Sequence, residues 1–428
     1  MPVAQGGSSV GKTALILGGL LIIKPLAAQN FKLFAGEGNS FPLLVGETAS
    51  PLPKWEEDNS QGQNGPISKT SENGSTTLVA NDLPASKQAG AGNAPLLPSL
   101  SWKDGKTTLT FANAEFSFSH RMQLRFTDLQ MEGGSNAPSF RVRRLKTKLN
   151  GWVYRKSLRY ELQLNWADAK PLEDANVSYD LSQGKNLLVI KAGQFKVPFG
   201  RQELTSSGNQ EFVDRSVVST TFARGRDIGV QVSGLSWDGK MDWRVGAFNG
   251  AGRNAIANDN GHLQVDARVT WQPFGPVGFS EGDLNVSSEP KMALAAQFES
   301  NDRRRTPTNE KQITWGGDAV LFWRGCFLFA EFFHGQRDPV GMPVYDSKGV
   351  ALQGGYTFVP SRWEVAARYA VVNPSDRSKH DLRTEKGLAL NYFIRQHGHK
   401  LQADLRQLED ERLQERSWEF RLQYQLVF

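Results

Sequence analysis

Four arginines lie within one polar stretch, GQFKVPFGRQELTSSGNQEFVDRSVVSTTFARGRDIG, which runs from Gly193 to Gly229. They are Arg201, Arg215, Arg224 and Arg226. A guanidinium stays protonated in proteins and binds oxyanions through paired N–H donors. The chemistry that this composition favours is therefore the binding of anions.

The two stretches that border this loop alternate apolar and polar residues, from Asn186 to Phe195 and from Arg226 to Trp237. A connection of this length in a compact domain is usually functional or disordered. Pro198 and Gly200 supply a turn, and several apolar residues could anchor the loop: Phe212, Val213, Val217, Val218 and Phe222. We therefore predict a loop folded into a cavity, with an ordinary surface excursion as the alternative.

No spacing of residues indicates catalysis or metal binding. Among six histidines only His397 and His399 are close in sequence, and no third ligand accompanies them. The single cysteine, Cys326, excludes an internal disulfide framework and a Cys-based zinc site. No Ser-His-Asp or paired-carboxylate arrangement stands out. We expect no enzymatic activity and no cofactor.

The composition favours a transmembrane β-barrel. The chain has 428 residues with 42 Gly, 11 Trp and 25 Phe, and its mean hydropathy is −0.45. Beyond the N-terminal region it has no apolar run long enough for a membrane helix. Strands of a transmembrane barrel carry apolar residues on only one face, which keeps the mean hydropathy low. The formal net charge of +6 is too small to indicate a nucleic-acid-binding protein.

The N-terminal region contains a P-loop pattern, GGSSVGKT, but no strand can precede it. The competing interpretation is a signal peptide over residues 1–28, with Lys12 before an apolar core and a small-residue cleavage region near Ala28. Residues 29–105 are rich in Gly, Ser, Asn, Gln and Pro and predict a flexible periplasmic segment. Residues 106–428 form the predicted barrel domain.

Period-two alternation dominates the rest of the chain and predicts about sixteen antiparallel strands. The links between them are alternately long and short, as in barrels with extracellular loops and periplasmic turns. One link disagrees, because Phe274 to Pro290 is long where a turn is expected; a strand could be miscounted there. The strands begin near Ala114, Phe140, Leu158, Ala175, Asn186, Arg226, Lys240, Leu263, Lys291, Gln312, Cys326, Gly349, Arg362, Lys386, His399 and Ser417.

A soluble β-protein whose sheets have one solvent-exposed face and one buried face would show the same alternation. Aromatic residues near the strand ends, such as Trp166, Trp237 and Tyr369, favour a barrel with interfacial girdles. The last stretch alternates without a break to Phe428. It resembles the C-terminal strand that outer-membrane barrels present to their assembly machinery, so we expect that machinery to be a partner.

Several ordered motifs resemble the phosphate-selective porin O/P family of Gram-negative outer membranes. These are GQFKVPFG, ELTSS, FVDRS, FARGRDIGV and VGAFNGAG, with FRVRRLKTKLNGW upstream and GLALNYFI downstream. The resemblance covers roughly Phe116 to Phe428. It implies an outer-membrane, all-β, sixteen-stranded antiparallel barrel, usually a homotrimer surrounded by lipid, whose third extracellular loop folds inward to narrow a pore for small anions.

The resemblance also implies substrate-binding residues, which are identified by the motifs that contain them. They are Arg143 and Arg144 in FRVRR, Ser206 and Ser207 in ELTSS, and Arg215 in FVDRS; Lys146 joins them because it faces the same lumen. By strict alternation only one of Arg143 and Arg144 points into the lumen. The alternatives are a solvated strand end for the two arginines and a turn or helix cap for the two serines.

Glu203 departs from the family pattern, because it stands where phosphate-specific members carry a lysine. A carboxylate in a constriction repels phosphate. The function predicted is passive diffusion of small anions, either phosphate or polyphosphate, with a general porin for small hydrophilic solutes as the alternative. A non-conducting structural or enzymatic barrel has little support.

Overall fold

The computed structural model describes residues 77–78, 98–132, 134, 136–255, 257–258, 261–304 and 309–428. The predicted signal peptide, residues 1–28, lies outside them, as does most of the segment from residue 29 to 105. No helix in the described part of the chain is long and apolar enough to span a membrane.

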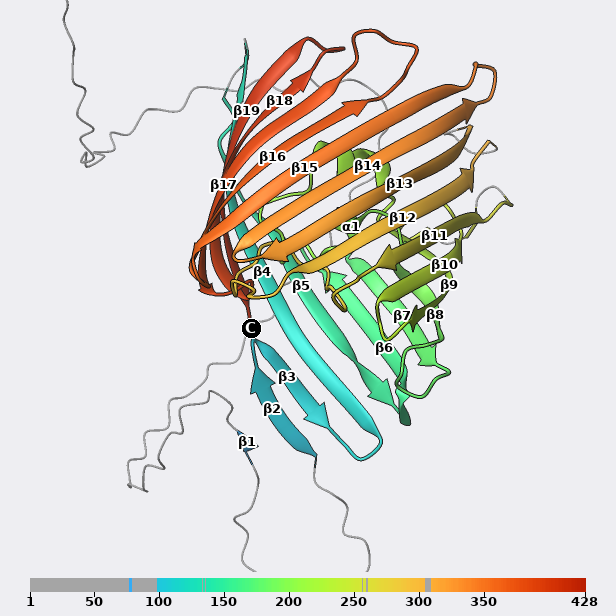
Figure 1. Ribbon diagram of the computed structural model, residues 1–428, viewed down its shortest axis with the longest axis vertical. Coiled ribbons are helices and arrows are strands. Elements are labelled where there is room, and N and C mark those ends of the chain that lie inside the picture. Colours follow the sequence, from blue (N-terminus) through green and yellow to red (C-terminus); the bar gives the residue numbers. More distant parts are fainter. Residues whose placement is uncertain are drawn as a thin grey trace, which may run out of the picture. The chain divides into compact units, whose positions relative to one another are not determined.

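Sixteen strands, β4 to β19, form a closed antiparallel barrel (Figure 1). Each strand pairs with the next in sequence, and β19 pairs with β4, as in Trp418 opposite Gln130. The predicted fold and strand number are confirmed. The strands are β4 (Ala114–Met131), β5 (Ser139–Val153), β6 (Arg155–Asn165), β7 (Leu172–Asp180), β8 (Val189–Lys196), β9 (Arg226–Ser236), β10 (Met241–Phe248), β11 (Gln264–Trp271), β12 (Lys291–Asp302), β13 (Glu310–Trp323), β14 (Cys326–Pro339), β15 (Tyr345–Val359), β16 (Trp363–Asn373), β17 (Arg383–Arg395), β18 (His399–Asp410) and β19 (Glu415–Val427).

Three shorter strands precede the barrel, namely β1 (Thr77–Leu78), β2 (Ser99–Lys103) and β3 (Lys106–Thr110). β2 and β3 form a hairpin, and β3 pairs with the start of β4, with Lys106 opposite Ser119. Residues 99–103 belong to the segment that we expected to be flexible, yet they form β2. The boundary that we placed after residue 105 lies between the turn of this hairpin and β3.

Alternation along the barrel strands separates a lipid-facing side from a lumen-facing side. On β16, Val365 and Tyr369 are exposed on the outside, whereas Glu364 and Arg368 are buried inside. Successive side chains of a strand point to opposite faces, so this pattern follows directly from the sequence.

Some inward-facing positions are apolar, which alternation alone did not predict. The inward residues of β14 include Phe327, Phe329 and Phe333 beside Glu331, all buried, whereas the outward Leu328 and Phe332 are exposed. The long β8–β9 loop, residues 197–225, packs on the β14 side of the lumen. It contains the two helices α1 (Arg201–Leu204) and α2 (Val217–Phe222), and α2 contacts β14 to β17. The predicted inward-folded third loop is confirmed.

Aromatic stacking and small residues dock this loop. The ring of Phe333 stacks on Phe199 and on Phe222, with centroids 5.3 and 5.2 Å apart. Gly349 and Gly355 leave space for the loop, because a Cβ atom on Gly349 would lie 2.6 Å from the Phe222 ring. The loop is therefore packed against the barrel wall as a protein core is packed.

The long link between β11 and β12 contains no strand, so the strand count was right and the expectation of a simple turn was wrong. The link turns into the barrel. Its Leu284 is buried, and its Val277 packs against the phenylalanines of β14. The β8–β9 loop and this link pack against strands on the β12–β18 side of the lumen.

Candidate functional site

A polar cavity of about 400 Å³ lies between the β8–β9 loop and strands β5 to β10. Nine basic side chains and four carboxylates line it, an excess of five positive charges. The basic residues are Arg143, Arg144, Lys146, Lys148, Lys191, Lys196, Arg215, Arg226 and Arg244, and the acidic ones are Glu161, Asp168, Glu173 and Asp174. We call this space the basic chamber.

All six predicted site residues line the basic chamber. Arg143, Arg144 and Lys146 reach it from β5, and Ser206, Ser207 and Arg215 reach it from the loop. The structure thus brings together residues that are up to 72 positions apart in sequence, from Arg143 to Arg215. That they bind an anion stays a prediction.

Arg143 and Arg144 both line the chamber, so the expectation that only one could face the lumen was wrong. Between Gln123 and Leu124 the pairing of β4 with β5 shifts, with Gln123 opposite Arg144 and Leu124 opposite Val142. Arg143 is the extra residue of this β-bulge. A bulge interrupts strict alternation, and two consecutive side chains can then turn to the same side.

The two loop serines differ in their contacts. Ser206 Oγ accepts a hydrogen bond of 3.0 Å from Arg121 Nη1. Ser207 Oγ is buried and has no hydrogen-bond partner in the described part of the chain, although the Ser207 carbonyl accepts from Gln123 Nε2. A buried hydroxyl without a partner costs free energy unless a ligand or water satisfies it. The Ser206 hydroxyl is thus engaged as an acceptor, whereas the Ser207 hydroxyl is engaged neither as donor nor as acceptor among the described residues.

Arg215 is held by the loop itself. Its guanidinium donates to the backbone carbonyls of Gln202, Glu203 and Thr205 and lies 2.9 Å from the Glu203 carboxylate. Lys196 Nζ donates to carbonyls of the same turn, including that of Leu204. Glu203 is therefore neutralised by Arg215, and it does not line the chamber. The repulsion that we expected from Glu203 is reduced by this ion pair.

Each carboxylate of the chamber has a basic partner. Glu161 lies 3.0 Å from Lys148, Asp168 lies 2.9 Å from Arg253, Glu173 lies 2.6 Å from Lys146, and Asp174 lies 2.8 Å from Arg226. Lys191 also lines the chamber, but no carboxylate pairs with it among the described residues. Its Nζ lies 4.5 Å from the centroid of the Phe195 ring.

The β11–β12 link also contributes to the chamber, through Phe279, although sequence reasoning did not identify the link as functional. Glu281 anchors it: its carboxylate accepts from the backbone N–H of Glu211 at 2.9 Å and from Gln353 Nε2 at 2.9 Å. Burial, followed by the charges of Glu364 and Glu281, raises the pKa of Glu211 well above its usual range. The unusual length of this link was the one signal in the sequence.

Phe279 brings the same link into the chamber wall. Its ring lies between two guanidinium groups, 5.1 Å from Arg201 and 5.2 Å from Arg244. Arg201 also donates to the Gly278 carbonyl at 2.7 Å. Cation–π contacts of this kind stabilise partly desolvated arginines. The link therefore contacts Arg244, which lines the chamber, and Arg201, which is buried and does not line it.

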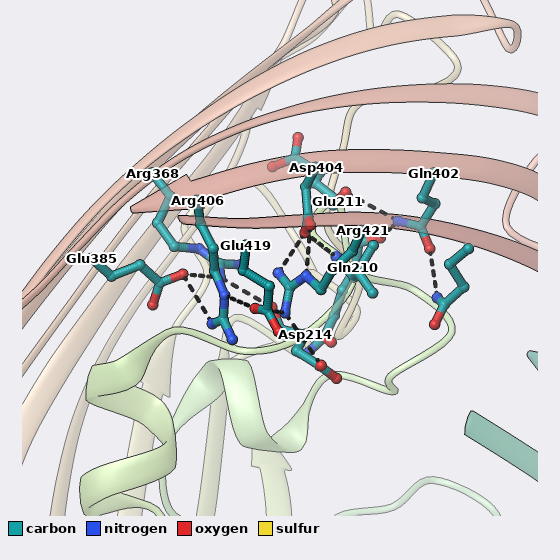
Figure 2. Close-up of polar contacts among 12 residues, drawn as sticks. Gln210, Glu211, Asp214, Arg368, Glu385, Gln402, Asp404, Arg406, Glu419 and Arg421 are labelled. Carbon is teal, nitrogen blue, oxygen red and sulfur yellow. Dashed lines mark hydrogen bonds and ion pairs between the residues drawn. The ribbon is translucent and has the colours of Figure 1, made fainter. Parts of the chain in front are cut away.

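Asp214 is the other feature that the sequence did not reveal. It lies in the loop next to Arg215, and it contacts arginines of the barrel wall. Figure 2 shows it close to Arg421 and Asp404, in a network that continues to Arg406 and Glu419. Burial alone would raise the pKa of Asp214, but Arg125 and Arg144 hold that pKa well below its usual range.

Known proteins resemble this chain in fold and in sequence. The anion-selective porin from Comamonas acidovorans superposes with a TM-score of 0.53 at 12% identity, over 74% of this chain and 100% of the porin. The outer membrane channel DcaP of Acinetobacter baumannii gives 0.53 at 11% identity, over 74% and 99%. Identities this low show a shared fold.

Two comparisons concern the sequence. An uncharacterized protein from Aquifex aeolicus is 24% identical over 248 residues, which is 50% of this chain, and the match spans 57% of that relative's length. The family model described as phosphate-selective porin O and P matches residues 116–408, which include the β8–β9 loop and every strand from β5 to β17 in full. The chain belongs to the phosphate-selective porin O and P family of outer-membrane barrels.

Proposed function

We propose that this outer-membrane porin is a passive diffusion channel selective for small anions, with phosphate or polyphosphate among the ions that pass. The observation that carries the proposal is the charge of the basic chamber. Its nine basic side chains outnumber its four carboxylates, and every one of those carboxylates is already ion-paired. Three carboxylates outside the lining also pair with chamber cations, Glu203 with Arg215, Asp214 with Arg144 and Asp242 with Arg244, so that Lys191 is the one lining cation without a carboxylate partner in the described structure.

The position of the chamber makes this charge effective. The loop and the β11–β12 link pack on the opposite side of the lumen, and we propose that a passing ion moves along the basic wall. Charges in a narrow, partly desolvated constriction interact more strongly than in bulk water, and a ring of basic residues favours anions.

β5 supplies a column of cations along the path. Arg144, Lys146 and Lys148 are two residues apart and share one face of the strand, at a spacing of roughly 7 Å. A row of weak sites lets an anion enter and leave, which conduction requires. We propose no catalytic role for the chamber and regard the barrel as non-enzymatic.

We also propose that the porin assembles as a homotrimer and that Phe428 is recognised during barrel assembly. The in-vitro folded OmpT of Vibrio cholerae, a trimer form, shares the fold at a TM-score of 0.50 and 9% identity. In the present chain the Phe428 ring stacks on His120, with centroids 5.5 Å apart, and half of its surface is exposed. An exposed terminal side chain is accessible to an assembly factor.

Reversal potentials in planar bilayers test the proposed selectivity. The purified porin is measured across a potassium chloride gradient, first as wild type and then as Lys191→Gln. Lys191 is a suitable position because it lines the chamber without a carboxylate partner in the described structure. The matched control is Lys106→Gln, which removes the same charge from the exposed β2–β3 hairpin outside the barrel.

We expect anion selectivity in the wild type, a smaller anion preference in Lys191→Gln, and no change in Lys106→Gln. Replacing chloride by phosphate at fixed ionic strength then separates a general anion pore from one that prefers phosphate. A cation-selective wild type would contradict the proposal. Equal permeability to anions and cations would favour a general porin.

A further inference from the structure

Three arginines of the barrel wall share a single carboxylate, which comes from the loop. Asp214 Oδ2 lies 2.5 Å from Arg125 Nη1, and Asp214 Oδ1 lies 3.3 Å from Arg144 Nη2 and 3.6 Å from Arg143 Nη2. Arg421 approaches Oδ2 at 3.4 Å but also binds Asp404 at 2.6 Å. Among the described residues, Arg125, Arg143 and Arg144 have no carboxylate other than Asp214.

The contacts of Asp214 are those that an oxyanion ligand would make. Arg125 binds it through two nitrogens, Nη1 and Nη2, at 2.5 and 3.2 Å, in the paired arrangement that guanidinium groups form with carboxylates and phosphates. Two further arginines approach from β5. The carboxylate side chain keeps 22% of its surface exposed, and that of Arg143 keeps 32%. The cluster is therefore open to ions in the chamber on the Arg143 side.

The loop does not need the Asp214 carboxylate in order to stay in place. Its backbone is held at the same point by other contacts: Val213 N–H donates to Asp404 at 3.0 Å, the Val213 carbonyl accepts from Arg125, and the Asp214 carbonyl accepts from Arg368. Phe212 and Phe222 are buried on either side. The side chain of Asp214 is thus separable from the anchoring of the loop.

We infer that Arg125, Arg143 and Arg144 form an oxyanion-binding site in which Asp214 acts as a built-in ligand that competes with the permeating anion. The inference rests on the proposed anion selectivity and deepens it. With Asp214 in place, a passing oxyanion can contact only the exposed Arg143 side of the cluster, so it binds weakly and dissociates quickly. The carboxylate sets a low affinity for the site, which suits a channel.

The variant Asp214→Asn tests this inference. The amide oxygen can still accept a hydrogen bond from Arg125, whereas the negative charge is removed. The measurement is the block of chloride current by inorganic phosphate at pH 7, in planar bilayers with the full-length purified porin. Glu409→Gln is the matched control, because it removes one charge from β18, where Glu409 forms an ion pair with Arg416, and neither residue lines the basic chamber.

We expect the half-blocking phosphate concentration to fall about tenfold in Asp214→Asn, as expected from one regained charge-assisted hydrogen bond, and to change little in Glu409→Gln. Chloride conductance without phosphate should not rise. If Asp214 only anchored the loop, the opposite would occur: conductance would rise and phosphate would block less well. That result, or an unchanged half-blocking concentration, would overturn the inference.

A second variant covers the case in which Asp214→Asn does not assemble. Arg143 is partly exposed and has no other carboxylate partner in the described chain, so Arg143→Gln should fold and should raise the half-blocking concentration of the otherwise wild-type porin severalfold. No change there would also overturn the inference. The wild-type reversal potential tests the proposed function separately, because it does not depend on how strongly phosphate binds.

Discussion

Replacing Phe222 by alanine should release the β8–β9 loop while leaving the barrel intact. Phe222 is 1% exposed, stacks on Phe333 with ring centroids 5.2 Å apart, and closely approaches Gly349. Truncating a buried phenylalanine to alanine costs about 3–5 kcal/mol. In this protein that cost falls on the docking of the loop, because the barrel strands are held by their own hydrogen bonds and Phe222 contributes to none of them.

A loss of about 3–5 kcal/mol shifts the ratio of docked to released loop by roughly 10²- to 10³-fold or more. Released loops no longer narrow the pore, so single-channel conductance should increase, with larger current fluctuations and weaker anion preference. Conductance and reversal potential in planar bilayers measure both effects. Mobility in cold detergent with and without boiling reports whether the barrel itself is folded.

Phe332→Ala is the matched control, because Phe332 is the outward neighbour of Phe333 on β14 and is 43% exposed. It removes the same side chain from the lipid-facing side and should leave conductance unchanged. Wild-type conductance and selectivity in a folded Phe222→Ala porin would refute the reasoning, since the loop would then be held without its largest apolar anchor.

Three further predictions concern the loop and the C-terminus. Burial and the nearby Glu364 raise the pKa of Glu211, so the docked loop favours the neutral form of this acid. The resulting stabilisation of the loop is complete below about pH 4.5 and is lost as pH rises through the raised pKa. Fluctuations of the open-channel current should therefore increase over that pH range in the wild type but not in Glu211→Gln. Arg215→Ala should reduce anion preference more than Arg224→Ala, because Arg224 is paired with a buried glutamate of β12 outside the chamber; equal reversal potentials for both variants would contradict this. Deleting Phe428 should lower the folded yield in cells but scarcely affect folding in vitro, and an unchanged cellular yield would argue against a role in assembly.

The strands and the limits of the loop could be predicted from the sequence, because alternation is a local property. Residues two apart on a strand share a face whatever the rest of the chain does. The loop predicted from Lys196 to Gly225 begins and ends within one residue of the observed ends of β8 and β9. The six predicted site residues also line one chamber, since the motifs that contain them belong to β5 and to this loop.

Alternation could not show which apolar faces meet lipid and which meet protein. Phe333 and Phe332 are adjacent and chemically identical, yet one is buried under the loop and the other is exposed on the outer surface. The difference arises only when the β8–β9 loop and the β11–β12 link fold inward. In the same way, the bulge at Arg143 depends on how β5 pairs with β4, and no local pattern predicts it.

The electrostatic character of the site was decided by contacts between distant parts of the chain. The sequence by itself determined a barrel, an inward loop and an excess of basic residues near it. Only the tertiary structure placed Glu203 on Arg215 and Asp214 among Arg125, Arg144 and Arg421. The effect of a charged side chain on a passing ion depends on the partners and the exposure of that side chain. Both are properties of the folded chain.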